Sequence, residues 1–184
     1  MKFVVHTKET APPAARKGLE TAEKLFGFIP NLLGVLAAAP IALEAYIILT
    51  KLLGDASLSP VEQQVVMLAG SHEYGCGYCM AAHSTVAGSA GMPAVVLEAL
   101  RGGTKLPDPK LEALCSFVLR VVRSRGRVSA EQIDAFLAAG YSSQNILEVV
   151  FGVAMKTLSN YVNHMARTPV DPQFSRQKWP AARS

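Results

Sequence analysis

Residues 59–83 carry the clearest structural signals of this chain and read SPVEQQVVMLAGSHEYGCGYCMAAH. The first four of them form a capping box with a proline in the first turn, which predicts that a helix begins at residue 60. Gly75 ends this helix at about residue 74, and residues 76–90 are expected to form the next one. This stretch therefore predicts two consecutive helices joined by one glycine.

Proline and glycine divide the rest of the chain in the same way. Prolines stand at first-turn positions and glycines follow helix ends, whereas no segment shows the two-residue alternation typical of strands. The expected fold class is all-α, with helices at about 13–26, 31–38, 41–53, 60–74, 76–90, 93–101, 109–125, 130–139 and 143–167. From about residue 169 we expect an irregular tail, because Pro169, Pro172 and Pro180 interrupt it.

Length and composition favour one globular domain over residues 1–184. The chain is 50% hydrophobic and 17% charged, which excludes general disorder. A chain of this length can bury about 70% of its unfolded surface without disulfides or a structural metal. Three cysteines are too few for a secreted disulfide framework, and residues 1–7 lack the apolar core of a signal peptide. We therefore expect a cytoplasmic protein.

Two classes of partner are not expected. The net charge of +4 is small, and the arginines at 120–127 cluster at the end of a predicted helix, where cations stabilise the helix dipole. No recognised nucleic-acid motif accompanies them. Residues 25–43 carry no charge, but two prolines and two glycines interrupt them, so they predict short buried helices and no membrane span.

The predicted chemistry lies in Cys76, Cys79 and His83. Their spacing places all three on one face of a helix. A helix N-terminus lowers the pKa of a thiol, and the thiolate is the nucleophile. His83, one turn beyond Cys79, can accept its proton or stabilise its anion. These residues predict a redox-active dithiol, and the chemistry needs no cofactor and no metal.

Two other interpretations of the cysteines stay open. His72 together with Cys76, Cys79 and His83 offers four ligands for a zinc ion, although closed zinc sites usually draw ligands from two elements. Alternatively, the two cysteines are simply small core residues. Cys115 lies on an apolar stripe of residues 111–122 and is expected in the core.

The chain resembles a known family in several segments. These are Leu58–Gln64, His72–Cys79 and Ala82–Ser84, with Phe26–Asn31 upstream and Asn163, His164 and Thr168–Asp171 downstream. They are similar to the alkylhydroperoxidase D-like proteins of the carboxymuconolactone decarboxylase superfamily, in its peroxidase-related branch. The resemblance covers about residues 18–174 and is most specific around the CxxCxxxH motif.

The resemblance implies a fold, an activity and partners. The fold would be a multi-helix bundle, and the chain would assemble as a homo-oligomer, a trimer or hexamer. The activity would be thiol-dependent reduction of a small hydroperoxide, of the peroxiredoxin type, with an external dithiol as reductant. The resemblance assigns attack to Cys79 and resolution to Cys76, whereas helix geometry alone leaves open which cysteine attacks.

The chain departs from the family pattern at two positions. Gln64 occupies the place of a glutamate that relays a proton, and Tyr78 replaces a histidine between the cysteines. Glu73 lies just before the cysteines and is a candidate substitute for the lost carboxylate, so Gln64, Tyr78 and Glu73 are the candidates for a proton relay or for lining the site. If the relay needs a carboxylate, Gln64→Glu is expected to speed oxidation about tenfold.

Two further functions remain as alternatives. Carboxymuconolactone decarboxylase-type decarboxylation of a lactone is disfavoured, because family members with that activity generally lack the cysteine pair. A non-enzymatic thiol switch, or a zinc-stabilised helical binding module, is kept open by the missing carboxylate at Gln64.

Overall fold

The computed structural model describes residues 3–180, and within them it contains nine α-helices and no strand. The helices are α1 (Pro13–Phe26), α2 (Asn31–Leu36), α3 (Pro40–Gly54), α4 (Pro60–Glu73), α5 (Gly77–Ser89), α6 (Ala94–Gly102), α7 (Pro109–Ser124), α8 (Ala130–Ala138) and α9 (Ser143–Ala166), followed by a 3₁₀ helix, η1 (Pro172–Gln177). The expected all-α fold class is confirmed. None of the described helices is both long enough and apolar enough to cross a membrane.

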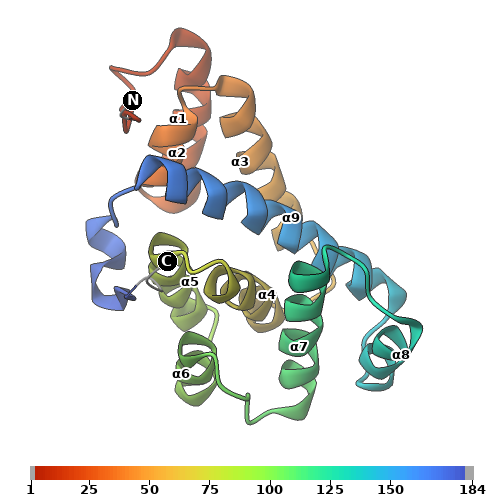
Figure 1. The fold of residues 1–184 in the computed structure, drawn as a ribbon. Coiled ribbons are helices and arrows are strands. Elements are labelled where there is room, and N and C mark those ends of the chain that lie inside the picture. The colour runs from red at the N-terminus through yellow and green to blue at the C-terminus, as the bar shows by residue number, and fades with distance from the viewer. Residues whose placement is uncertain (1–2, 181–184) are drawn as a thin grey trace.

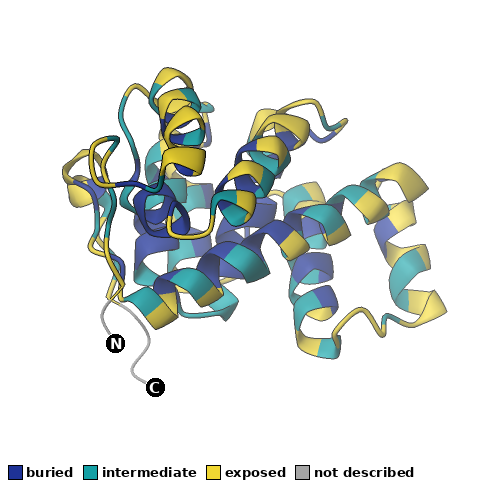
Figure 2. Ribbon diagram, turned by 90° about the horizontal axis from the view of Figure 1, so that it is seen from above, coloured by how far each residue is buried: buried dark blue, intermediate teal, exposed yellow. Residues whose placement is uncertain are grey.

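The long helix α9 crosses the molecule and organises the other helices around it (Figure 1). Helices α2 and α3 contact it on one side, and α4, α5 and α7 contact it on the other. Helix α4 is enclosed by α5, α7 and α9, and every residue from 63 to 71 is buried. The buried positions gather along the inner faces of these helices, while exposed ones lie on the outside (Figure 2).

Helix α4 begins where its sequence predicts. The hydroxyl of Ser59 accepts a hydrogen bond from the backbone N–H of Glu62, and the carboxylate of Glu62 accepts one from the backbone N–H of Ser59 at 2.8 Å. Gly75 then turns the chain with a positive φ of 68°, a conformation that suits glycine. The next helix starts one residue later than predicted, because Cys76 has an extended backbone and caps α5.

Two glycines lie where α4 and α9 pack together. A Cβ atom at Gly152 would lie only 2.7 Å from Cγ1 of Val66 on α4. One turn further along α9, the aliphatic stem of Lys156 passes over Gly70, where a Cβ would lie 3.6 Å from it. Gly152 therefore lets the two helices approach closely, and the stem of Lys156 packs on α4 beside Gly70 at ordinary van der Waals distance.

The tail after residue 169 is more ordered than the sequence predicts. Residues 169–179, which we call the strap, include η1 and pack against α5. The guanidinium of Arg101 donates to the carbonyls of Gln177 and Lys178, and the indole N–H of Trp179 donates to the carbonyl of Arg101 at 2.9 Å. Pro169 and Pro172 prevent α9 from continuing into this segment, and side-chain hydrogen bonds hold it in place.

Candidate active site

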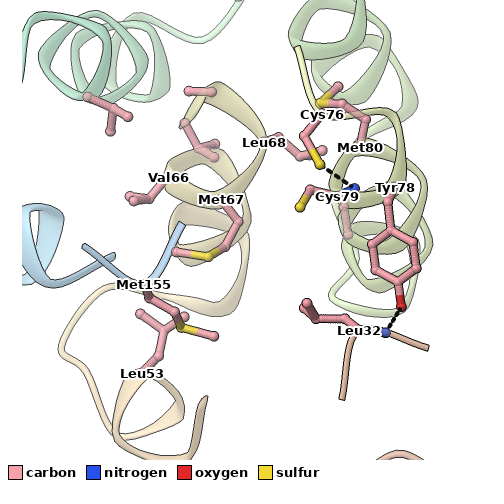
Figure 3. Packing of buried hydrophobic residues seen from close by; sticks show 14 of the residues in the cluster. Leu32, Leu53, Val66, Met67, Leu68, Cys76, Tyr78, Cys79, Met80 and Met155 are labelled. Carbon is pink, nitrogen blue, oxygen red and sulfur yellow. Dashed lines mark hydrogen bonds between the residues drawn. The ribbon is translucent and has the colours of Figure 1, made fainter. Parts of the chain in front are cut away.

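The two cysteines meet at the N-terminus of α5. Cys76 is the N-cap residue, and its sulfur accepts a hydrogen bond from the backbone N–H of Cys79 at 3.3 Å (Figure 3). Both thiols are free, and each residue is only 1% exposed. The cap therefore brings the predicted pair together and leaves both sulfurs available for a disulfide.

A buried lysine faces this pair. Lys156 of α9 is 1% exposed, and its ammonium donates a hydrogen bond to Nε2 of His83 at 2.9 Å. Among the described residues, no carboxylate lies within ion-pair distance of this ammonium. A buried cation needs a compensating negative charge, and the cysteine pair is the source of one.

His83 holds the lysine and is itself held by Gln64. The Nδ1 atom of His83 lies 3.0 Å from Oε1 of Gln64. Because an amide oxygen only accepts, Nδ1 carries the ring proton, and Nε2 is left to accept from Lys156. Burial lowers the pKa of His83 well below its usual range, and the charge of Lys156 lowers it further. His83 is therefore a neutral acceptor.

The surroundings of Cys79 favour its thiolate. Burial alone would raise the pKa of Cys79, but a hydrogen bond from the Cys76 thiol and the positive charge of Lys156 outweigh burial. The side-chain amide of Asn163 donates to the Cys79 sulfur at 3.2 Å, and Ser159 also contributes. Together they lower the pKa of Cys79 to about 5.

The same contacts keep Cys76 protonated. Its thiol donates to the sulfur of Cys79, and this hydrogen bond, together with burial, raises the pKa of Cys76. The charge on Cys79 in turn raises the pKa of Lys156, although burial works in the opposite direction. The reduced site therefore holds one thiol, one thiolate and one ammonium.

A pocket of about 310 Å³ is lined by one of the two cysteines. Cys79, His83 and Lys156 line it, whereas Cys76 does not. Most of the other lining residues are apolar or aromatic, and they include Phe26, Phe28, Leu32, Leu33, Tyr46, Tyr78, Val86 and Phe174. The ring of Phe174, from the strap, packs edge-on against Phe28 with centroids 5.6 Å apart. A small apolar molecule in this pocket would meet Cys79 first.

Tyr78 holds the strap and is not placed as a proton relay. Its hydroxyl donates to Oδ2 of Asp171 at 2.6 Å and accepts from the backbone N–H of Leu32 at 3.3 Å (Figure 3). Burial and the neighbouring carboxylate of Asp171 raise the pKa of Tyr78. Asp171 also accepts from the backbone N–H of Asn31. The tyrosine thus ties η1 and α2 to α5, beside the pocket.

The structure does not bring Glu73 to the cysteines. Both of its carboxylate oxygens accept hydrogen bonds from Arg123, at 2.8 and 2.7 Å, and this pairing lowers the pKa of Glu73. The carboxylate is committed to α7. Of the other two candidates, Gln64 contacts His83, and Tyr78 lines the pocket.

Neither the zinc ligand set nor a third reactive cysteine is assembled. The ring of His72 packs against Trp179, with centroids 5.4 Å apart. Within residues 3–180 no group of three or more histidine, cysteine or acidic side chains is placed to hold a metal ion. Burial raises the pKa of the half-buried Cys115 to about 12, which makes it a poor nucleophile.

Sequence reasoning missed Lys156 and gave no role to Asn163. A signal was present, because Val149, Lys156 and Asn163 follow one another at seven-residue steps and so share one face of α9. A lysine on a face that also carries valine and methionine is a candidate for a buried, functional charge.

No protein-family model matches this chain, and no curated protein matches it. Solved structures do resemble it. An uncharacterised peroxidase-related protein with an alkylhydroperoxidase AhpD core, from Ralstonia eutropha JMP134, aligns with a TM-score of 0.84 and 21% identity over 94% of this chain and 93% of its own. A peroxidase-related protein from Silicibacter sp. TM1040 aligns at 0.80 and 18%, over 96% and 94%.

A debrominase solved in complex with 2,3,4-tribromopyrrole is also similar. It aligns with a TM-score of 0.74 and 17% identity, over 90% of this chain and 89% of its own. All three alignments span nearly the whole chain. The chain therefore has the alkylhydroperoxidase D-like fold, with a CxxC cysteine pair at the head of α5.

Proposed function

We propose that this protein is a thiol-dependent hydroperoxide reductase. One observation carries the proposal: Cys79 lines an apolar pocket in an environment that favours its thiolate, with the protonated Cys76 thiol beside it. The thiolate is the form that attacks peroxides, and a neighbouring thiol is the form that resolves the product. The peroxidase-related names of two structural neighbours agree with this chemistry.

The reaction follows from the two thiols. The Cys79 thiolate attacks the distal oxygen of the hydroperoxide, the O–O bond breaks, and the departing alkoxide takes up a proton to become an alcohol. Cys79 is then a sulfenic acid. The Cys76 thiol attacks its sulfur, water leaves, and a disulfide forms between the two cysteines. An external dithiol reduces the disulfide and returns the protein to its first state.

Mixing the reduced protein with tert-butyl hydroperoxide tests this proposal. We expect the loss of two thiols for each peroxide consumed, and peptide mapping is expected to place the disulfide between Cys76 and Cys79. Cys115→Ser is the matched control and should react at the wild-type rate, because burial keeps Cys115 protonated. A dominant bridge to Cys115, or oxidation no faster than that of an unstructured CxxC peptide, would contradict the proposal.

A second candidate reaction uses the same dithiol. The aromatic lining of the pocket suits a flat ring, and one structural neighbour is a debrominase bound to 2,3,4-tribromopyrrole. The same mixing experiment with this compound distinguishes the reactions, because reductive debromination releases one bromide for each disulfide formed. Bromide release without a response to hydroperoxide would favour this candidate. Oxidation by neither compound would favour a non-enzymatic thiol switch.

We also propose that the chain forms a homo-oligomer. Large apolar side chains are exposed on the outer side of α9, at Leu147, Val150, Tyr161 and Met165. Exposed apolar patches of this kind usually mark interfaces. Light scattering at micromolar concentration is expected to give a multiple of the 19.6 kDa chain mass. A single monomeric species under these conditions would remove this proposal.

A further inference from the structure

We propose that Lys156 is the proton donor of this reaction and that it exchanges its proton with every turnover. Its ammonium would protonate the alkoxide released when Cys79 is oxidised, and its amine would recover a proton when the disulfide is reduced. This inference rests on the proposed function, since it identifies the group that supplies the proton for O–O cleavage.

Few groups other than Lys156 could supply a proton to the alkoxide in this pocket. The titratable groups that face it are Cys76, Cys79 and His83 from α5 and Tyr46 from α3. Burial and the charge of Lys156 keep His83 uncharged, and its single ring proton points to Gln64. Burial makes Tyr46 a weaker acid than usual. The lysine carries the charged, acidic proton in the pocket beside the reactive sulfur.

The charges in the site balance only if Lys156 releases its proton on oxidation. In the reduced site the ammonium of Lys156 is compensated by the thiolate of Cys79, and no described carboxylate pairs with it. Oxidation converts the thiolate into an uncharged sulfenic acid and then a disulfide. If the lysine kept its proton, an unpaired cation would remain buried, which is unfavourable. If the lysine gives its proton to the alkoxide, the site is neutral in every state.

The atoms and electrons balance over the whole cycle. In the first step the sulfur donates two electrons to the O–O bond, the distal hydroxyl joins Cys79, and the ammonium proton joins the alkoxide. In the second step Cys76 loses its proton as a disulfide forms and water leaves. In the third step the external dithiol supplies two electrons and two protons. One proton restores the Cys76 thiol, and the other restores the ammonium beside the Cys79 thiolate.

His83 and Gln64 act through the lysine as positioning residues. The hydrogen bond from Gln64 fixes the His83 ring so that Nε2 faces the ammonium, at 2.9 Å. A neutral imidazole can hold a donor that alternates between ammonium and amine, because its Nε2 accepts a hydrogen bond from either form. An amide at position 64 is sufficient for this arrangement, since the ring needs only an acceptor.

Counting protons tests the assignment directly. Absorbance at 240 nm first establishes that the reduced protein holds one thiolate at pH 7.5. Oxidation by tert-butyl hydroperoxide in a weakly buffered indicator solution is then expected to take up no proton from solvent. If Lys156 stays charged, one proton is taken up per disulfide. That result, or the absence of the thiolate, would overturn the assignment.

Diamide, a two-electron thiol oxidant, separates this inference from the proposed function. Its reduction consumes two protons per disulfide, which Cys76 and Lys156 would supply, so the expected uptake from solvent is again zero. If the protein does not react with hydroperoxide but takes up no proton from solvent when diamide oxidises it, the proposed function is wrong and the proton exchange is supported. Uptake of one proton with diamide would overturn the assignment of Lys156.

Two variants complete the experiment. Lys156→Arg keeps a positive charge beside the thiolate, but arginine does not release its proton in proteins. Uptake is therefore expected to rise to one proton per disulfide. Lys156→Met is expected to lose the thiolate and to react at least about 10²-fold more slowly at pH 7. Thermal melting checks that both variants fold. If they do not, the proton count of the wild-type protein alone decides whether Lys156 releases its proton on oxidation. An Arg variant that folds and still takes up no proton would contradict the proposal.

Discussion

Replacing Cys79 with serine is expected to abolish oxidation by hydroperoxide, whereas Cys76→Ser is expected to retain one fast turnover. A hydroxyl is a much weaker acid than a thiol and is not oxidised by peroxide, so loss of the nucleophile should slow the reaction by more than about 10³-fold. Without Cys76, the sulfenic acid on Cys79 has no resolving thiol. It should accumulate and be trapped by dimedone, which mass spectrometry detects.

The opposite pattern would reverse the roles of the two cysteines. It would mean that the helix N-terminus acts more strongly on Cys76 than Lys156 acts on Cys79. The magnitudes favour Cys79. A helix terminus contributes typically about 0.3–1 kcal/mol, less than one pKa unit. A charged neighbour in a buried site shifts a pKa by about 1–3 units. Lys156, together with the hydrogen bonds that Cys79 receives from Asn163 and Ser159, should therefore place the charge on Cys79.

The helices were largely predictable because capping residues and first-turn prolines mark their ends in the sequence. Ser59, Asp108 and Ser129 cap α4, α7 and α8 through side-chain hydrogen bonds, with Pro60 and Pro109 in the first turns of α4 and α7. Such signals depend only on neighbours in the sequence. The cysteine pair was predictable for the same reason, since the i, i+3 spacing alone brings both sulfurs to the head of one helix.

The remainder of the site depends on contacts between distant segments. Lys156 is separated from His83 by 73 positions, and Asn163 from Cys79 by 84. Helical periodicity shows which face of α9 is buried, but not which helix covers that face. The strap was missed for a related reason: prolines prevent α9 from continuing, yet they carry no information about the bond between Asp171 and Tyr78.

Gln64, a candidate for a proton relay or for lining the site, lies next to His83. Because the family pattern has a relay glutamate at this position, the resemblance predicts that Gln64→Glu accelerates oxidation. In the structure, the amide oxygen orients His83, which in turn holds Lys156. The proposed proton source is Lys156, which contacts Gln64 only indirectly, through His83. A carboxylate at position 64 would add a negative charge to a site whose charges already compensate each other. The faster oxidation of Gln64→Glu stays a prediction from the family resemblance.

The pH dependence of the thiolate should separate this site from an ordinary cysteine. The pKa of Cys79 is lowered to about 5 from a usual value of about 8.5, so its thiolate is present at neutral pH and is lost as the pH falls through 5. At pH 7 most of Cys79 should therefore be ionised, against about 3% of an unperturbed thiol. We expect the absorbance at 240 nm to report one thiolate per chain, with a midpoint near pH 5.

Variants assign this titration to its causes. Cys79→Ser should remove the transition, while Cys115→Ser should leave it unchanged. Lys156→Met should move the midpoint upward, because the positive charge that helps to offset burial is removed while the hydrogen bond from the Cys76 thiol remains. Asn163→Ala removes one hydrogen bond and should move it by about one unit. A wild-type midpoint near 8.5 would mean that burial cancels the effect of the lysine, and Cys79 would then lack the charge on which attack, proton transfer and neutrality of the pocket all depend.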